Sequence, residues 1–206
     1  MDELVCLGDV AAGPQPVETV VRLRALGCPV VMGNWMRGFS TASPLGRAER
    51  HGGSSSGGEW WARKLSAADR AFLRTFLART ELRLGGFPIL CFHGSTLSYD
   101  DVILATTPTD ELLSMLAVFN HPLMVGGHTH VQVVRVVEAT LVVNSGSVGL
   151  PFRGLPAGEF QRISSWAEYA LVRVEDGRLS VELRRASYEV EAMLQLTIDS
   201  GAATPA

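Results

Sequence analysis

Gly126-Gly127-His128-Thr129-His130 is the stretch around which the rest of the chain is organised, and it follows a short apolar run at residues 123–125. A strand that ends at a glycine pair can turn tightly and present two imidazoles at one edge. Imidazole is the commonest protein ligand for transition metals. The same stretch also fits a polar turn whose histidines only hydrogen-bond to the backbone, so the metal hypothesis depends on what the remaining sequence supplies.

The composition predicts one globular domain over residues 1–206, with residues 191–206 forming a frayed tail. The chain is 47% hydrophobic and 19% charged, and 206 residues are enough to bury one core. It contains no apolar run of the ~18 residues that a membrane span needs, and it begins with acidic rather than basic residues. We therefore expect a cytoplasmic protein with no membrane partner.

Charge and cysteine content narrow the classes further. A net charge of -3 argues against non-specific binding to nucleic acid. The three cysteines, Cys6, Cys28 and Cys91, are widely spaced and lie within or beside apolar segments, which is typical of buried reduced thiols.

Three further apolar segments also end at polar residues. Residues 4–7 lead into Asp9, residues 29–32 lead into Asn34, and residues 87–92 lead into His93. Taken alone, Asn34 could simply be a turn residue, and His93 could simply be a core histidine with hydrogen-bond partners. In a mostly parallel sheet, however, the carboxyl ends of the strands meet at one rim. We therefore predict that these side chains converge with His128.

The converging groups would suit a particular kind of cation. One carboxylate, one amide oxygen and two or more imidazoles favour manganese, iron, zinc or nickel, and no thiolate demands a softer ion. The two oxygens of Asp9 could bridge a pair of ions roughly 3.5 to 4 Å apart, as in two-metal phosphatase sites.

Local signals predict the intervening elements. A helix opens at Pro16, places Val17, Val20 and Val21 on one face, and ends at Gly27. Residues 37–59 have no periodicity and contain a glycine-serine run, which is typical of an insertion or a lid over the site. A capping box at Ser66 to Asp69 starts a second helix, which we expect to carry Phe72, Leu73, Phe76 and Leu77.

The second half of the chain predicts hairpins around one helix. Gly85-Gly86 joins strands at 82–84 and 87–92. Thr109 caps a helix, and we expect Leu112, Leu113 and Leu116 to face inward. A tight turn at residues 175–177 joins strands at 169–174 and 179–184.

Taken in chain order, five of these motifs resemble those of the calcineurin-like metallophosphoesterases, most closely the small bacterial and archaeal phosphodiesterase branch. The motifs are Leu7-Gly8-Asp9, Gly33-Asn34, Phe92-His93-Gly94, Gly127-His128-Thr129-His130 and Asn144-Ser145-Gly146-Ser147-Val148-Gly149. The resemblance implies an α/β fold, a four-layer αββα sandwich of two mixed sheets flanked by helices. It also implies that Asp9 bridges two metals, that Asn34, His93 and His128 hold the second, and that His130 holds the first.

The chain departs from the family pattern at its start. The family begins with a strand ending in Asp-x-His, whereas this chain opens inside what resembles the second strand, so the first strand and helix are missing. The first metal then keeps only Asp9 and His130, and a single bound ion is the alternative to two. We expect the true start codon to lie upstream, which the genomic DNA would test.

A second departure concerns proton donation. Many relatives follow Gly-Asn with a histidine and an acid, but Trp35 and Met36 stand here, and neither side chain is an acid at neutral pH. General acid catalysis is typically worth ~10² to 10⁴-fold, so we expect slow turnover of unactivated monoesters.

The function that the resemblance implies is hydrolysis of a small phosphoester, most simply a phosphodiester, by metal-activated hydroxide. Arg153 is a candidate phosphate clamp, with a surface arginine as the alternative. His51 and His121 receive no role. The rival hypothesis is a degenerate relative that binds one metal weakly or none and acts as an interaction module, as the similar retromer sorting subunit does.

Overall fold

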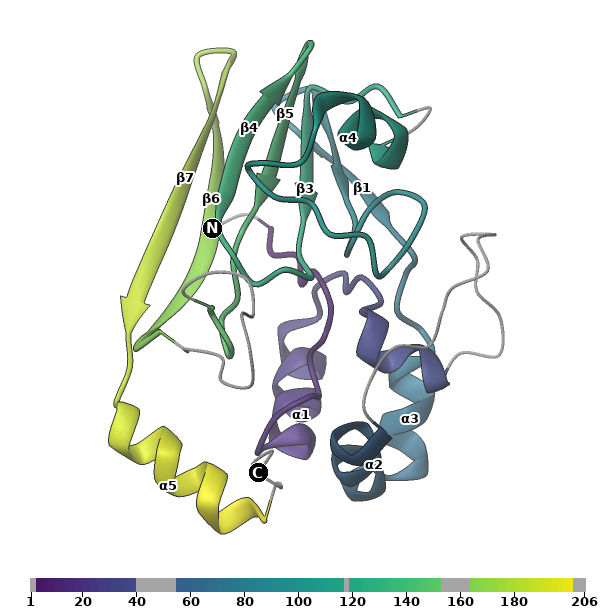
Figure 1. The fold of residues 1–206 in the computed structure, drawn as a ribbon, viewed down its shortest axis with the longest axis vertical. Helices are drawn as coiled ribbons and strands as arrows, with labels where there is room; N and C mark the ends of the chain where they lie inside the picture. Colours follow the sequence, from purple (N-terminus) through teal and green to yellow (C-terminus); the bar gives the residue numbers. More distant parts are fainter. Residues whose placement is uncertain (1–2, 40–54, 117–118, 153–163, 202–206) are drawn as a thin grey trace.

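The computed structural model describes residues 3–39, 55–116, 119–152 and 164–201. In Figure 1 the strands fill the upper half of the molecule, and the helices α1, α2, α3 and α5 fill the lower half. No helix within these described ranges is both long and apolar enough to cross a membrane.

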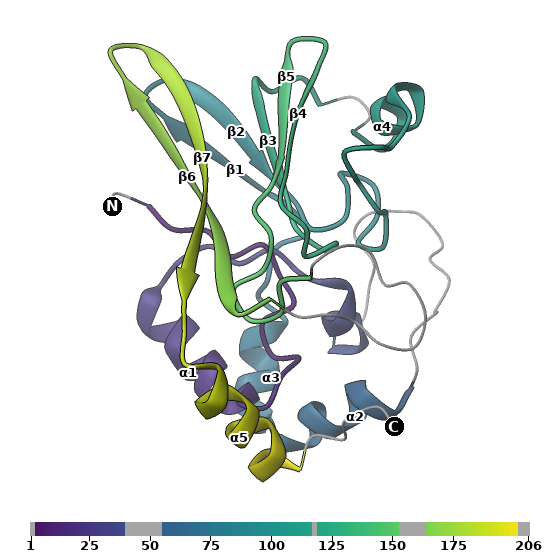
Figure 2. The ribbon, with the colours of Figure 1, turned by 60° about the vertical axis from the view of Figure 1, so that its left-hand side comes forward.

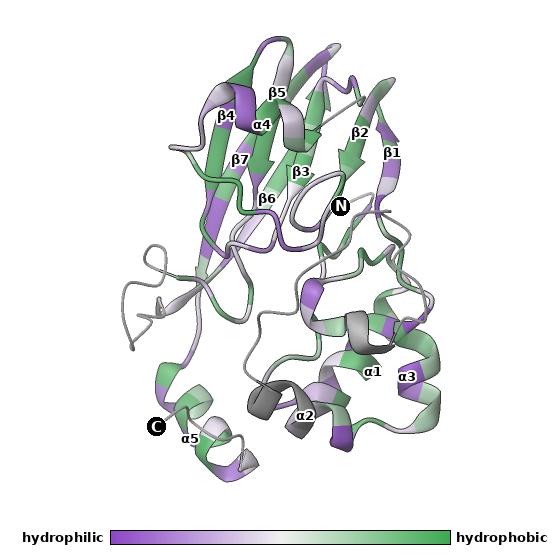
Figure 3. Cartoon of the chain, turned by 45° about the vertical axis from the view of Figure 1, so that its right-hand side comes forward, coloured by the Kyte–Doolittle hydropathy of each residue, from purple (hydrophilic) through white to green (hydrophobic). Residues whose placement is uncertain are grey.

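The main sheet has five strands in the order β1-β2-β3-β5-β4. The three central strands β2, β3 and β5 run parallel to one another, and the two edge strands pair antiparallel to their neighbours. Figure 3 shows hydrophobic residues along most of β2, β3 and β5, as expected for strands covered on both faces. The bounds are β1 (Thr80–Leu84), β2 (Phe87–Cys91), β3 (Leu123–Gly126), β4 (Val133–Val137) and β5 (Thr140–Asn144).

A second β layer packs on one face of this sheet. It contains the hairpin of β6 (Trp166–Glu175) and β7 (Arg178–Ser187), whose turn places Asp176 and Gly177 at positive φ, as predicted. Figure 2 shows the hairpin and the main sheet as separate layers. The contact between them is apolar, and its members include Ala170, Val172, Val181 and Leu183 from the hairpin and Ile89, Leu123, Val125 and Val143 from the sheet.

The extended segments before Asp9 and Asn34 belong to this second layer. Cys6 bridges Val30 in parallel, and Val31 bridges Leu77 in parallel. The predicted parallel direction of these segments is therefore confirmed, although each is held by isolated bridges instead of a continuous ladder. Val31 faces the main sheet and Val30 faces the helices, so the segment is buried on both sides.

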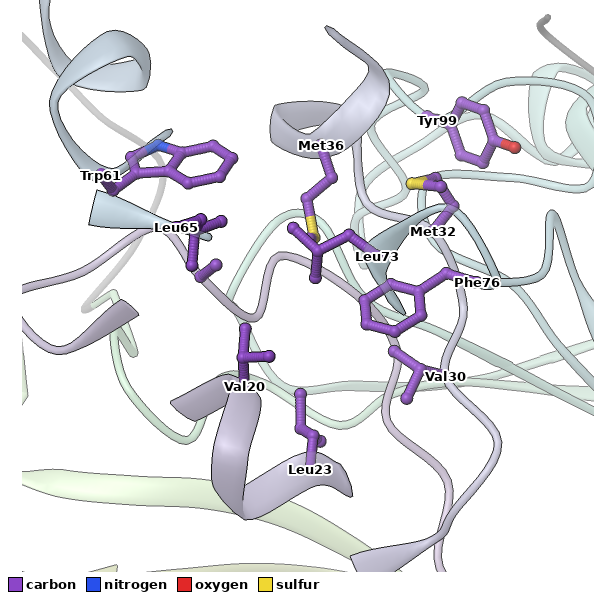
Figure 4. Close-up of a cluster of buried hydrophobic side chains, with 11 residues drawn as sticks. Val20, Leu23, Val30, Met32, Met36, Trp61, Leu65, Leu73, Phe76 and Tyr99 are labelled. Atoms are coloured by element: carbon purple, nitrogen blue, oxygen red, sulfur yellow. The ribbon is translucent and has the colours of Figure 1, made fainter. Parts of the chain in front are cut away.

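Helices cover the outer faces of both layers. Beneath the second layer lie α1 (Pro16–Leu26), α2 (Ser55–Lys64) and α3 (Ala67–Leu73), whose shared core is drawn in Figure 4. On the free face of the main sheet, α4 (Thr109–Leu116) buries Leu112 and Leu116 against Leu90, Phe92 and Met124. The molecule thus has the predicted αββα arrangement of two sheets flanked by helices.

Several local predictions need correction. The tail is a helix, α5 (Val190–Ser200), because residues 190–200 contain no glycine or proline and Gly201 closes the helix in the left-handed conformation. The predicted loop at 37–59 begins with a 3-10 helix, η1 (Asn34–Phe39), and its end is already part of α2. Residues 40–54 lie outside the described part.

Three helix faces also differ from the prediction, and one of the differences is that Leu113 of α4 is 37% exposed. Val21 is 56% exposed, because α1 turns Val20 and Leu23 into the core instead. The helix from the capping box, which is present as predicted, ends at Leu73, so Phe76 and Leu77 lie beyond it and only Phe76 is buried.

Candidate metal centre

Asp9 stands where the first extended segment ends, and glycines make room for it. The residue has a φ of 54°, and Gly8 before it has a φ of 107°, so the backbone turns sharply after Leu7. A Cβ atom on Gly33 would lie 1.9 Å from Oδ1 of Asp9. The carboxylate therefore lies directly against the backbone of the neighbouring Gly33-Asn34 turn, whose Trp35 amide donates a hydrogen bond to the same Oδ1 at 3.3 Å.

His93 follows the end of β2 and is 1% exposed. Its Nδ1 lies 2.7 Å from the carbonyl oxygen of Leu7, which can only accept a hydrogen bond, so Nδ1 carries the proton. In the neutral ring, Nε2 then presents a lone pair. That lone pair lies 3.1 Å from Oδ2 of Asp9 and 3.3 Å from Oδ1 of Asn34, both of which are also acceptors.

His128 and His130 follow β3 in an unusual backbone conformation. Both have positive φ, at 67° and 57°, which costs a non-glycine residue of the order of 1–3 kcal/mol. The ring of His128 meets that of His93 edge to face with centroids 5.2 Å apart, and its Nδ1 is buried without a hydrogen-bond partner. His130 bonds the Leu150 carbonyl through Nδ1 at 2.9 Å and stacks on Phe152.

The donor set fits a divalent cation. Ligand atoms of Asp9, His93 and His128 all lie within 4.8 Å of one another. Oδ2 of Asp9 is buried and, like Nδ1 of His128, has no contact with hydrogen-bond geometry. Lone pairs that lie close together in a buried site repel unless a proton or a metal ion lies between them. Oxygen and imidazole ligands without thiolate suit manganese, iron, zinc or nickel.

The pKa values of the four ionisable groups in the cluster are shifted by burial and by their neighbours. Burial opposes the charge on both Asp9 and His93, but each group stabilises the charge of the other, so the pKa of Asp9 is lowered and that of His93 is raised. Burial, and then the neighbouring His93, lower the pKa of His128 to about 4. Burial also lowers the pKa of His130. Neutral His128 and His130 keep lone pairs for a metal.

The structure brings most of the predicted residues together. Asp9, Asn34, His93 and His128 meet at the carboxyl ends of their segments, as the convergence argument predicted. His130 is close enough to influence the pKa of Asp9 but is not part of the 4.8 Å group. Arg153 and His51 lie outside the described residues. Met36 is fully buried in the helical core, whereas Trp35 is 46% exposed.

Sequence reasoning left Asn144 without a role, although it also follows an apolar strand run. Its side-chain amide donates to the carbonyl of Gly127 and to the hydroxyl of Thr129, on either side of His128. The signal that singled out Asp9 and His93, a polar residue directly after buried strand residues, could have found it.

This fold and this site define an α/β protein with a candidate metal centre at the ends of its parallel strands. The model of the calcineurin-like phosphoesterase superfamily domain matches residues 1–175, and the chain therefore belongs to that superfamily. The family hydrolyses phosphoesters with divalent metals, which the grouping of Asp9, His93 and His128 fits. No curated protein sequence matches the chain.

Solved structures share the fold at low sequence identity. The hypothetical protein PH1004 from Pyrococcus horikoshii OT3 is 18% identical with a TM-score of 0.72, over 95% of this chain and 79% of that one. A metallophosphoesterase from Sphaerobacter thermophilus is 21% identical with a TM-score of 0.69, over 98% and 84%. Vps29 from Chaetomium thermophilum is 13% identical with a TM-score of 0.50, over 91% and 82%.

Proposed function

We propose that this protein is a metal-dependent phosphodiesterase whose metal ligands are Asp9, Asn34, His93 and His128, with His130 as a ligand of a first metal. The observation that carries the proposal is the meeting of Asp9 Oδ2 and His93 Nε2 at 3.1 Å, close to His128, whose buried Nδ1 has no hydrogen-bond partner. A divalent cation bound between these groups would satisfy the lone pairs of the carboxylate and of both imidazoles at once.

A bound divalent ion would offer positive charge to the phosphate oxygens and lower the pKa of a water that attacks phosphorus. The chain's own residues prepare the site for that ion. The Leu7 carbonyl selects the tautomer of His93 in which Nε2 faces Asp9, and such an outer hydrogen bond also makes the imidazole a stronger ligand. The Trp35 amide orients the Asp9 carboxylate through Oδ1.

The proposed substrate carries a leaving group that departs without a proton from the protein. Trp35 stands where many relatives have a histidine, and an indole cannot act as an acid at neutral pH. Aryl and other weakly basic alkoxide leaving groups meet this condition. A small phosphodiester of that type is therefore the proposed substrate class, with manganese as the first ion to test.

The proposed setting is the cytoplasm. Cys6, Cys28 and Cys91 are all free thiols, and Cys91 is buried, which suits a reducing compartment. Burial raises the pKa of Cys91 to about 12 and that of Cys6 to about 11, so neither thiol is reactive at neutral pH.

The test is metal analysis of the purified chain together with turnover of bis-p-nitrophenyl phosphate. We expect turnover that requires manganese, iron, zinc or nickel, that a chelator abolishes and that the added metal restores. Turnover of p-nitrophenyl phosphate compared with an alkyl monoester measures the dependence on the leaving group. A protein that binds the metal but hydrolyses none of these esters would instead be an interaction module.

A further inference from the structure

Asn144 is the last residue of β5, and its side chain lies between the strand ends that form the candidate metal centre. It pairs with Gly126 of β3 on one side and with Val133 of β4 on the other, and it is 5% exposed. A buried amide needs hydrogen-bond partners within the protein.

The backbone at His128 forms a strained turn. The Thr129 amide donates to the carbonyl of Gly127 at 2.8 Å, across a single residue, and His128 between them has a φ of 67°. A turn of this kind with positive φ is rare and strained, particularly for a residue other than glycine. It persists only where other contacts hold both of its ends.

Asn144 supplies those contacts. Its Nδ2 donates to the Gly127 carbonyl at 2.5 Å and to the Thr129 hydroxyl at 3.0 Å, so one amide group grips both residues that flank His128. Its Oδ1 accepts the amide of Gly146 at 3.0 Å, which fixes the orientation of the side chain. The oxygen and both donor directions of the amide are thus occupied.

We propose that Asn144 is a positioning residue, which holds the turn around His128 in the conformation that aims its imidazole at Asp9 and His93. The inference rests on the proposed function for its metal-binding consequence, and on the hydrogen bonds alone for its structural one. Asn144 does not coordinate the ion in this proposal. It acts through the backbone of the residue that does.

The test compares Asn144→Ala with the matched control Thr140→Val, at the opposite end of the same strand. Thr140 also donates one side-chain hydrogen bond to a backbone carbonyl, that of His121, at 2.9 Å. Removing an outer partner of a metal ligand typically lowers metal affinity about 10- to 100-fold. We expect this loss of Mn²⁺ affinity, measured by isothermal titration calorimetry, in Asn144→Ala and an affinity within about twofold of wild type in Thr140→Val.

A second readout needs no metal. In the metal-free protein, Asn144→Ala should accelerate hydrogen exchange of the Thr129 amide, because the turn loses its restraint, whereas Thr140→Val should leave that exchange unchanged. Faster exchange with weaker binding supports the proposal. Unchanged exchange of the Thr129 amide in folded Asn144→Ala overturns it, as does equal loss of affinity in the two variants.

Thr129→Val covers the case in which Asn144→Ala does not fold. This nearly isosteric change removes only the hydroxyl that Asn144 grips, and we expect about a threefold or larger loss of affinity together with faster exchange nearby. Wild-type exchange in this variant overturns the proposal. If the wild-type chain binds no metal, the proposed function fails, and the exchange comparison still decides the role of Asn144.

Discussion

Nε2 of His93 lies 3.1 Å from Oδ2 of Asp9, while Nδ1 of the same ring is held 2.7 Å from the carbonyl oxygen of Leu7. Because the carbonyl already takes the Nδ1 proton, the short contact to Asp9 requires either a second proton on the ring or a metal ion. The pKa of His93 is raised and that of Asp9 is lowered, because each group stabilises the charged form of the other when no metal is bound.

Metal binding is therefore predicted to release a proton. The ion must displace the proton that the Asp9 carboxylate stabilises on His93, against the opposing effect of burial. Calorimetric titration with Mn²⁺ near neutral pH, in two buffers of different ionisation enthalpy, should give a binding heat that depends on the buffer, because the buffer takes up the released proton. A binding heat that is identical in both buffers would contradict this account of the pair.

Removing an imidazole from the cluster is predicted to abolish its metal chemistry. His93→Ala and His128→Ala should each lower metal affinity by more than about 100-fold, since loss of a ligand costs more than loss of its outer partner. Turnover of bis-p-nitrophenyl phosphate should fall with it.

The control for these variants is His121→Ala. His121 is also buried, but it bonds Glu81 at 3.0 Å near the opposite end of β3, so its loss should lower stability and leave metal affinity unchanged. Turnover that survives in His93→Ala and His128→Ala would show that the ligand assignment is wrong.

The metal-free protein is predicted to lose stability through His128 as the pH falls below about 6.5. Its pKa in the folded state is about 4, mainly because of burial, against about 6.5 when unfolded. Between these values the unfolded chain binds a proton that the folded chain excludes, so the stabilisation is complete above pH ~6.5 and is lost as the pH falls towards 4.

The size of this effect is about 1 to 3 kcal/mol. Urea unfolding at about pH 7 and at about pH 4.5 should show a smaller loss of stability in His128→Asn than in wild type, since the variant lacks the titrating group. Asp9 and His93 also titrate, so the comparison between the two proteins is the measurement. Equal losses in both would refute the prediction.

We predict that no larger residue can replace Gly33, because the Asp9 carboxylate occupies the space that a side chain would need. An added Cβ would lie 1.9 Å from Oδ1 and 2.4 Å from the amide nitrogen of Asp9, so Gly33→Ala must push the carboxylate out of place. We expect a loss of about 1–3 kcal/mol in the free energy of unfolding, as for other overpacked sites, together with weaker metal binding.

Gly13→Ala provides the comparison for that prediction, because a Cβ there meets no atom within 4 Å. It should leave metal binding unchanged and alter stability by less than about 1 kcal/mol. Thermal unfolding with and without metal separates the two effects, and wild-type stability and metal binding in Gly33→Ala would show that the Asp9 loop can move aside without loss of stability, which would contradict the prediction.

Much of the fold could be predicted from local signals, because those signals act over a few residues. The capping box at Ser66 and Asp69, the left-handed Gly27 after α1 and the hairpin turn at Asp176 and Gly177 all stand as predicted. The predictions were wrong where the local sequence allowed more than one structure and tertiary packing selected one of them. Val20 rather than Val21 faces the core, and residues 190–200 form a helix despite weak periodicity.

Part of the candidate site could likewise be predicted from local signals, and part could not. A polar residue after each apolar run indicated Asp9, Asn34, His93 and His128, and parallel strand direction was enough to predict that they meet. The same signal stood at Asn144, but its meaning lies in contacts to Gly127 and Thr129, which no pattern within β5 could reveal.

The sequence by itself determined which ligand atoms are available and on which strand ends they stand, since both follow from residue type and short-range hydrophobic pattern. Only the tertiary structure decided which imidazole nitrogen of His93 faces a backbone carbonyl and which faces the carboxylate. The physical reason is that His93 takes its tautomer from the Leu7 carbonyl, 86 residues away in the chain, and such a hydrogen bond exists only after the layers have packed.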